Sequence, residues 1–197
     1  MNREKMCLID MDGTLFDYEG KLREDLAKLA APNDPEINDL HDESIAWLRN
    51  RITLVTSQPG WWRHLPLLKS GELLLSAARE IGFSCKILTK GPRKKTLAWA
   101  EKVECINDRW PDLDIDIVGK DKTGTYGRVL IDDFPDYMSG WLKHRPRGSG
   151  IMPKCSYNLD FNHPNVILYD ESNLEQVLHA MKAAFQRPTG EHWRDYL

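Results

Sequence analysis

Residues 6–14 of the chain read MCLIDMDGT, a short apolar run followed by two acids and a glycine. A continuous apolar run of four residues is typical of a strand buried on both faces of a parallel sheet. Asp10 and Asp12 follow directly, at the edge where open α/β sheets present their ligand crevice, and Gly13 permits a tight turn. The stretch therefore predicts a buried strand with two carboxylates at its carboxyl end.

Similar apolar runs along the chain predict further strands. They are Ile52 to Val55, Lys86 to Leu88, Ile115 to Val118, Val129 to Ile131 and Val166 to Tyr169. Between several of them the apolar residues have helical spacing. The clearest helix begins at Ser172, with Glu175 in capping-box position, and stops before Pro188. Strands that alternate with helices indicate a mainly parallel sheet covered on both faces, so the predicted fold class is α/β.

Two stretches do not fit a simple alternation of strand and helix. Residues 17–50 and 59–82 have helical spacing, and the two prolines of segment 32–35 divide the first stretch into two expected helices. We predict that both stretches form a helical cap over the carboxyl edge of the sheet. The predicted core consists of residues 1–16, 51–58 and 83–197. Arg145 to Gly150 is predicted to be a mobile loop.

The composition excludes several classes of protein. The 197 residues include 27 basic and 30 acidic side chains, and this balance predicts no attraction to nucleic acid or to an anionic membrane. No apolar segment is long enough to span a bilayer. The polar start of the chain is unlike a secretory leader, and four widely spaced cysteines are typical of reduced thiols in a cytoplasmic protein. The basic cluster at residues 143–147 is interpreted as a solvated face.

Polar residues follow two further predicted strands. Asp132 and Asp133 follow the strand at Val129 to Ile131, and adjacent acids at such a position suit a hard cation that prefers oxygen ligands. Thr56 and Ser57 follow the strand at Ile52 to Val55. Their hydroxyl and backbone N–H groups can hold phosphoryl oxygens. We therefore expect an acidic, metal-binding site beside a phosphate-binding strand end.

These motifs resemble, in their order, those of the haloacid dehalogenase superfamily, and within it the 5′(3′)-deoxyribonucleotidases. The resemblance covers roughly residues 5–170 and is carried by Asp10 to Thr14, Thr56-Ser57-Gln58-Pro59, Asp121-Lys122-Thr123 and Leu130 to Asp133. It implies a Rossmann-like three-layer fold with a small helical cap. Two residues depart from the nucleotidase pattern: Gln58 stands before the proline, and Phe134 follows the acid pair where those enzymes often have arginine.

The resemblance also implies a mechanism and a cofactor. Asp10 is implied to be the nucleophile that forms an aspartyl phosphate, and Asp12 its acid–base partner. Mg²⁺ is the implied cofactor, held by Asp10, by the backbone carbonyl of Asp12 and by one or both of Asp132 and Asp133. The chain is thus expected to be a phosphoric monoester hydrolase.

Two lysines are implied to bind the phosphate together with Thr56 and Ser57. Five lysines lie in the appropriate half of the chain: Lys90, Lys94, Lys95, Lys120 and Lys122. We favour Lys122, because its spacing to Asp132 matches the deoxyribonucleotidase pattern. Lys95 is the second candidate, since it begins a Lys-Thr-Leu-Ala-Trp segment that resembles a helix start of that family.

Aromatic residues of the predicted cap suit a nucleobase. Tyr18 is an expected substrate contact, because the resembling nucleotidases place an aromatic residue eight positions after the first acid. Trp61 is the second expected contact, because it follows the second motif, together with Trp62, within the predicted cap. The expected substrate is a nucleoside monophosphate. A phosphatase for a sugar phosphate or another small metabolite and a non-catalytic binding protein with the same fold are the alternatives. The sequence leaves a homodimer open.

Overall fold

The computed structural model describes residues 5–42 and 44–197, so residues 1–4 of the predicted core and residue 43 of the predicted cap lie outside the described part. Within it, six parallel strands form one sheet in the order β3-β2-β1-β4-β5-β6. They are β1 (Met6–Ile9), β2 (Ser84–Lys90), β3 (Asp114–Val118), β4 (Val129–Ile131), β5 (Ser149–Pro153) and β6 (Val166–Tyr169). The predicted α/β class is confirmed.

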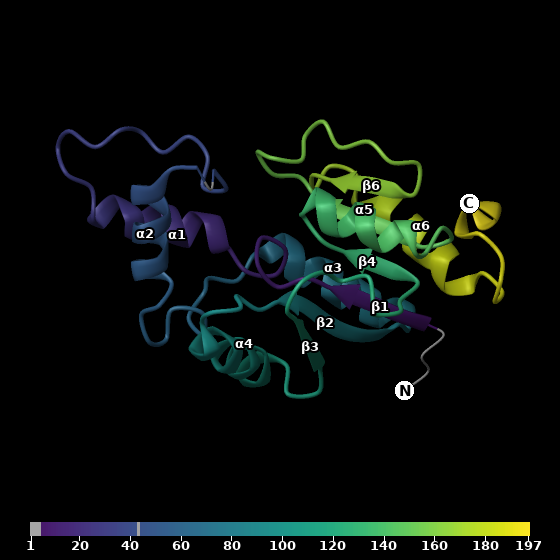
Figure 1. Ribbon diagram of the computed structural model, residues 1–197. Helices are drawn as coiled ribbons and strands as arrows, with labels where there is room; N and C mark the ends of the chain where they lie inside the picture. The colour runs from purple at the N-terminus through teal and green to yellow at the C-terminus, as the bar shows by residue number, and fades with distance from the viewer. Residues whose placement is uncertain (1–4, 43) are drawn as a thin grey trace.

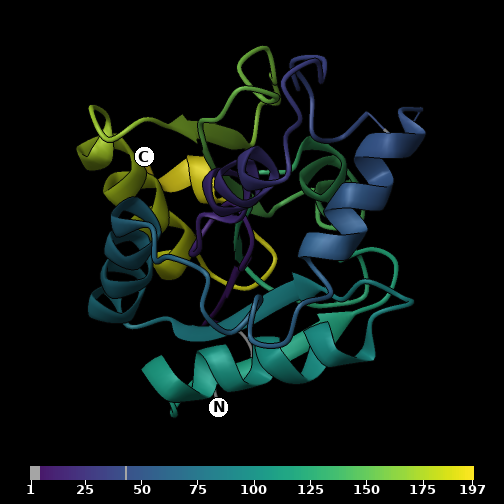
Figure 2. The ribbon, with the colours of Figure 1, turned by 90° about the vertical axis from the view of Figure 1, so that its left-hand side faces the viewer.

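Helices lie on both sides of the sheet (Figures 1 and 2). They are α1 (Tyr18–Lys28), α2 (Ala46–Val55), α3 (Lys69–Ile81), α4 (Thr96–Arg109), α5 (Pro135–Lys143), α6 (Leu174–Gln186) and a short 3-10 helix, Trp193–Tyr196. Successive strand residues point to opposite faces. Cys7 and Ile9 therefore belong to a large apolar cluster with α3, α4 and α6, whereas Leu8 and Leu130 pack with α5. No helix of the described ranges is long and apolar enough to cross a membrane.

The first two helices stand apart from the sheet as a separate lobe, at the left of Figure 1. Asp17 caps α1 by accepting a hydrogen bond from the Gly20 backbone N–H at 2.8 Å, and Leu22 and Leu26 form the buried face of the helix. Two helices follow β1 with the proline segment between them, as predicted, but the second has other bounds: α2 begins only at Ala46 and continues to Val55. Because only eight residues separate the end of β1 from the start of α1, this lobe lies beside the carboxyl ends of the strands.

The predicted strand at Ile52 to Val55 is wrong, because these residues are the last turns of α2. A run of four apolar residues cannot by itself distinguish a strand from a helical turn. In α2 only one face is covered, so Val55 joins the apolar cluster while Leu54 is 54% exposed. Residues 51–58 accordingly lie in α2 and the turn after it, where α2 contacts α1, and not in the sheet.

Strand β5 is absent from the sequence prediction and overlaps the predicted mobile loop at Arg145 to Gly150. Its buried Gly150 explains the error, because glycine usually weakens a strand pattern. A Cβ atom at Gly150 would lie 2.5 Å from the sulfur of Met138, so this position requires glycine for α5 to approach the sheet. Helix α6 ends before Pro188 as predicted, but the expected capping box is wrong: Ser172 donates to Asp170 at 2.6 Å and does not cap the helix.

Candidate active site

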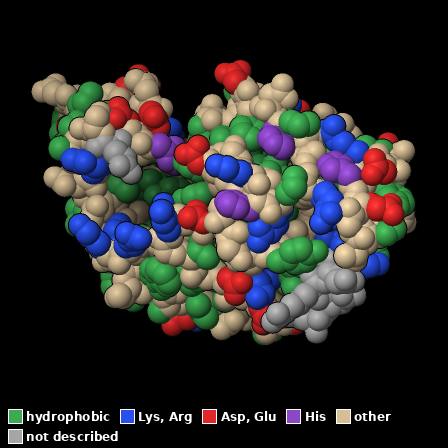
Figure 3. Space-filling view, turned by 45° about the vertical axis from the view of Figure 1, so that its right-hand side comes forward, with side chains coloured by type: hydrophobic (Ala, Val, Ile, Leu, Met, Phe, Trp, Pro, Cys, Tyr) green, Lys and Arg blue, Asp and Glu red, His purple; other side chains and the backbone are tan. Residues whose placement is uncertain are grey.

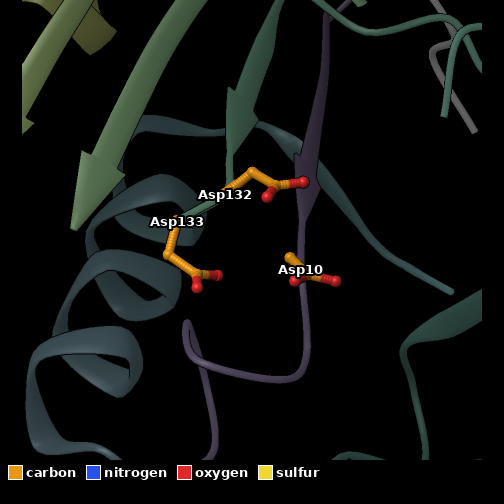
Figure 4. A group of neighbouring side chains, drawn as sticks. All are labelled: Asp10, Asp132 and Asp133. Carbon is orange, nitrogen blue, oxygen red and sulfur yellow. The ribbon is translucent and has the colours of Figure 1, made fainter. Parts of the chain in front are cut away.

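Three carboxylates converge at the carboxyl ends of two neighbouring strands (Figure 4). Asp10 follows β1, and Asp132 and Asp133 follow β4, which pairs directly with β1. One oxygen atom of each lies within 4.8 Å of the others, and all three side chains are buried. Negative charges at this separation in a buried site repel one another strongly. The cluster therefore needs positive charge nearby.

Lys122 supplies part of that charge. Its Nζ atom lies 2.6 Å from Asp10 Oδ1 and 2.6 Å from Asp132 Oδ2. Burial alone would lower the pKa of Lys122, but the charges of Asp10 and Asp132 outweigh burial and raise that pKa, so the side chain stays an ammonium. The prediction that Lys122 lies beside the acid cluster agrees with this geometry.

One ammonium does not balance three carboxylates. Burial, together with the charges of neighbouring acids, raises the pKa of Asp132 to about 8 and that of Asp133 to about 6. A small divalent cation with oxygen ligands would remove this excess of negative charge. The donor set of Asp10, Asp132 and Asp133 therefore fits Mg²⁺, which prefers carboxylate oxygens.

Asp133 is fixed by both the first motif and a later loop. Thr14 Oγ1 donates to Asp133 Oδ1 at 2.8 Å, and the Tyr157 hydroxyl donates to Oδ2. Asn158 Nδ2 donates to the backbone carbonyl of Asp133 at 2.8 Å. Gly13 has a φ of +79°, and a Cβ atom there would lie 2.3 Å from Asp133 Oδ2. The turn after β1 thus requires glycine both for its backbone conformation and for this contact.

Asp12 has its own cationic partner, which the sequence analysis missed. Lys102 on α4 is fully buried, and its Nζ donates to Asp12 Oδ2 and, at 2.9 Å, to the hydroxyl of Thr89. Burial raises the pKa of Asp12, and the nearby ammonium of Lys102 only partly opposes that rise. The second oxygen, Asp12 Oδ1, is buried and has no hydrogen-bond partner among the described residues. One oxygen of Asp12 is therefore held by Lys102, whereas the other has no partner among the described residues.

Thr89 lies where the sequence analysis expected Thr56, at the end of the strand beside β1. Ile87 pairs with Ile9, so Thr89 is level with the turn that follows β1. The prediction placed a strand at Lys86 to Leu88 but did not use the polar residue that comes next. Thr89 directly follows an apolar run and stands shortly before a Gly-Pro pair. This pattern could have identified it as a polar residue at a strand end.

No hydrogen bond or ion pair among the described residues joins Thr56, Ser57 or Lys95 to the four acids of the site. Thr56 follows the end of α2, where its hydroxyl donates to the Ile52 carbonyl at 2.6 Å and accepts from Lys95 Nζ. Ser57 is exposed. None of the three residues lines the cavity over Asp10. The hydrogen bond between Lys95 and Thr56 connects the end of α2 to the start of α4.

A cavity of about 920 Å³ opens over Asp10 and Asp12, between the α1–α2 lobe and the sheet edge. Figure 3 shows the surface hollowed between these two parts. Its aromatic lining residues are Tyr18, Trp62, Phe134, Tyr137 and Tyr157, and its basic ones include Arg49, Lys90, Arg93 and Lys120. A cavity of this size accommodates a small organic ligand, since such sites typically measure about 300 to 1,000 Å³.

Tyr18 lines this cavity, and its ring stacks on Trp62 with the centroids 5.5 Å apart. Trp61, the other predicted substrate contact, does not line the cavity; its Nε1 donates to Asp25 at 2.9 Å. Trp62 takes that place, with Lys102 Nζ 4.8 Å from the centroid of its ring. The Tyr18–Trp62 pair is therefore one part of the aromatic lining of the cavity.

No protein-family model matches the chain, and neither does any curated protein. Solved structures do match it. A magnesium-bound form of Bacillus subtilis YfnB, assigned as a HAD-hydrolase, has 15% sequence identity and a TM-score of 0.55, over 88% of this chain and 98% of that chain. A Thermotoga maritima protein assigned as a β-phosphoglucomutase has 14% identity and a TM-score of 0.56 over the same shares of the two chains.

A predicted phosphatase from Clostridium acetobutylicum is similar to the same degree, with 17% identity and a TM-score of 0.52 over 88% of this chain and 98% of that chain. The fold is that of the haloacid dehalogenase-like hydrolases. In this HAD-like fold the carboxyl ends of the parallel strands form the ligand edge, and Asp10, Asp132 and Asp133 lie at that edge. The similar structures show only the fold, whereas the site is defined by the positions of the three acids and their lysine partner.

Proposed function

We propose that this chain is a magnesium-dependent phosphomonoester hydrolase that works through an aspartyl phosphate on Asp10. The observation that carries the proposal is that Asp10 and Asp12 each contact a different buried lysine. Asp10 lies in the acid cluster and contacts Lys122, whereas Asp12, which lines the same cavity, is held by Lys102. A nucleophile and an acid–base group with different surroundings suit two different roles.

Mg²⁺ would be held by Asp10, by Asp132 or Asp133 and by the backbone carbonyl of Asp12. When bound, it supplies positive charge against the phosphoryl oxygens and against the carboxylates themselves. Lys122 is the protein's own cation at this position. The Thr89 hydroxyl, which Lys102 holds beside Asp12, is a further candidate besides Thr56 for contact with the phosphate.

The reaction uses two acids in succession. A carboxylate oxygen of Asp10 attacks phosphorus in line, the phosphorus–ester oxygen bond breaks, and Asp12 gives its proton to the departing alkoxide. Asp12, now ionised, then removes a proton from a water molecule that attacks the aspartyl phosphate. This second step releases inorganic phosphate and restores Asp10. The hydrogen bond from Lys102 orients Asp12 toward the leaving-group oxygen in the first step and toward the attacking water in the second.

Helices α1 and α2 form the cap in this proposal, and the rest of the chain forms the core. Helix α3 joins the core, because it contacts β2 and α6, although the sequence analysis placed residues 59–82 in the cap. The cavity between cap and core limits the access of water to the reacting phosphate and contacts the leaving group. Substrate choice is therefore expected to depend on α1, α2 and the loop between them.

We propose nucleoside monophosphates as the substrates. The aromatic pair of Tyr18 and Trp62 supports this, because a base stacked on an aromatic side chain gains about 1 to 3 kcal/mol. A sugar phosphate is the second candidate, supported by Glu19 and Asp42, which line the cavity and can accept hydrogen bonds from sugar hydroxyls.

A panel of phosphomonoesters assayed with Mg²⁺ tests both candidates. Deoxyribonucleotides should have a higher kcat/KM than sugar phosphates of similar size. Tyr18→Ala should lower kcat/KM for nucleotides by about tenfold or more and leave a generic aryl phosphate nearly unchanged, whereas Tyr18→Phe should retain the preference. An unchanged ratio of nucleotide to generic substrate in Tyr18→Ala would favour the sugar phosphate candidate. Absence of turnover on the whole panel would favour a binding protein.

A further inference from the structure

A second cavity, of about 170 Å³, lies at the opposite end of the sheet from the acid cluster. Arg128 immediately precedes β4, whereas Asp132 immediately follows it, so the two ends are about 13 Å apart along the strand. The lining residues come from three separate segments: Tyr126 to Arg128, His144 to Gly148 after α5, and Arg187, Thr189 and Gly190 after α6. The proposed catalytic cavity and this one share no lining residue.

Four arginines gather around this cavity: Arg128, Arg145, Arg147 and Arg187. We call them, with the cavity, the distal arginine site. Arg128 is 3% exposed and Arg187 is 6% exposed. The lining includes no aspartate or glutamate. In residues 5–42 and 44–197, the arginines that form ion pairs are Arg51, Arg63 and Arg79, and none of these belongs to the site.

Backbone carbonyls satisfy only part of these guanidinium groups. Arg128 Nη1 donates to the carbonyls of Ala184, Phe185 and Arg187 at the end of α6, with the shortest distance, 2.6 Å, to Arg187. Such bonds explain Arg128 as a cap for α6. The Nε atoms of Arg128, Arg145 and Arg187 are buried and have no hydrogen-bond partner among the described residues.

Helix capping does not explain why several positive charges share one small cavity. Arg145 makes only a weak bond, of 3.5 Å, to the carbonyl of His144, and its guanidinium lies 5.8 Å from the ring centroid of Trp141. Buried charges are costly unless an opposite charge or several hydrogen bonds compensate them. Oxyanions such as phosphate match the fork of N–H donors that arginine presents. Arg187 and Arg147 each donate from Nη1 to a backbone carbonyl, of Glu191 and Gly190, at 2.8 Å, but these neutral acceptors do not offset the guanidinium charges. A small oxyanion would offset them.

We propose that the distal arginine site binds a small phosphate-type oxyanion, contacted by Arg145, Arg147 and Arg187. The volume of about 170 Å³ is smaller than a typical site for a whole organic ligand, so it suits inorganic phosphate, pyrophosphate or one phosphoryl group. The inward position of Arg128 and Arg187 favours a compact anion over the backbone of a nucleic acid, which needs an open surface. This proposal does not depend on the catalytic one.

Calorimetric titration of the 197-residue chain with inorganic phosphate and with pyrophosphate tests the site. The titrations are made with Mg²⁺ and again with a chelator, because binding at the distal arginine site needs no metal and should persist in both. Arg145→Gln should weaken binding in the chelator by about tenfold or more, since it removes a charged hydrogen-bond donor. Lys143→Gln is the matched control: Lys143 is exposed on the same segment, does not line the cavity, and its loss should change the affinity less than twofold.

Arg147→Gln is a second variant for the case in which Arg145→Gln disturbs folding. Because Arg147 is exposed, its replacement should leave folding intact. Catalytic turnover of a small phosphomonoester should be unchanged in both variants. The proposal is overturned if neither anion binds in the chelator, or if both arginine variants bind them as tightly as the natural chain. The proposal would also be overturned if a short oligonucleotide without terminal phosphates bound the chain while phosphate and pyrophosphate did not.

Discussion

The two acids that follow β1, Asp10 and Asp12, each contact a different buried ammonium group. Lys122 contacts Asp10 and Asp132, whereas Lys102 contacts Asp12 and the hydroxyl of Thr89. The first lysine offsets charge at the nucleophile. The second orients the carboxyl group that must exchange a proton with the leaving group.

Replacing Lys102 should therefore affect proton transfer more than substrate binding. We expect Lys102→Met to lower kcat/KM for alkyl phosphates, whose leaving groups need a proton, by about tenfold to a hundredfold, because general acid catalysis contributes about 10² to 10⁴. p-Nitrophenyl phosphate, whose leaving group departs without a proton, should lose little. The measurement is the dependence of log kcat/KM on the pKa of the leaving group, which should become steeper.

Lys94→Met is the control, since Lys94 is an exposed lysine on the segment just before α4. Lys102→Arg should restore part of the activity on alkyl phosphates. An equal loss on all leaving groups would show that Lys102 only supports folding.

Some of these single residues could be predicted from the sequence, and others could not. Asp10, Asp132, Asp133 and Lys122 stand in motifs with fixed local spacing, and the structure brings them together. Asp12, from the same motif as Asp10, lines the same cavity. Lys102 is 90 positions from Asp12 and lies inside a helix, where lysine is ordinary. Only the packing of α4 against the turn after β1 identifies it.

At the scale of secondary structure elements, α3 approaches the first motif more closely than any side chain would allow. A Cβ atom on Gly71 would lie 2.0 Å from the backbone oxygen of Thr14. Thr14 in turn holds Asp133 by a hydrogen bond of 2.8 Å. The start of α3 therefore fixes the loop that positions the acid cluster.

Gly71→Ala should disturb both folding and catalysis. We expect the free energy of unfolding to fall by about 1 to 3 kcal/mol, because backbone atoms cannot move aside cheaply. Turnover should fall as well, since Thr14 and Asp133 shift together. Gly124→Ala is the matched control, because a Cβ atom there would meet nothing within 4 Å. Chemical denaturation and steady-state assays measure both effects, and equal stability of the two variants would contradict this account of α3.

The elements themselves were predicted where their patterns are regular. Strands β1, β4 and β6 have the predicted bounds, because each is a continuous apolar run. The errors at Ile52 to Val55 and at β5 have one cause: short runs take their conformation from tertiary contacts. Leu54 faces solvent on α2, and Gly150 sits under α5, and neither fact is contained in the local sequence.

At the scale of the whole molecule, the catalytic cavity depends on contacts between cap and core. Lys95 of the core donates to Thr56 at the end of the cap, and His41 of the cap lies against the ring of Tyr157, with the centroids 4.9 Å apart. Tyr157 itself donates to Asp133. The position of the cap is thus connected to the acid cluster, which a sequence pattern cannot reveal.

Metal removal should affect both activity and stability of the whole chain. A chelator should stop turnover and Mg²⁺ should restore it, because the excess negative charge of the cluster is otherwise uncompensated. Mg²⁺ at a hundredfold excess over its Kd should raise Tm by about 5 to 10 °C, since binding to the folded state alone contributes about 2.7 kcal/mol. Asp132→Asn should reduce the rise in Tm that Mg²⁺ causes. Asp114→Asn is the control, because Asp114 is exposed and its replacement should leave that rise unchanged. Full activity without metal would contradict the assignment.

The central claim is the covalent bond between Asp10 and phosphate, and trapping it is the most direct measurement. The chain is mixed with a phosphomonoester that it turns over and Mg²⁺, quenched in acid within one turnover, and digested for peptide mass analysis. The account predicts one phosphoryl group on the peptide that contains Asp10, removed by hydroxylamine and absent from a folded Asp10→Asn variant, which should also lack turnover. Normal turnover by Asp10→Asn, or phosphate found on another residue, would contradict the account.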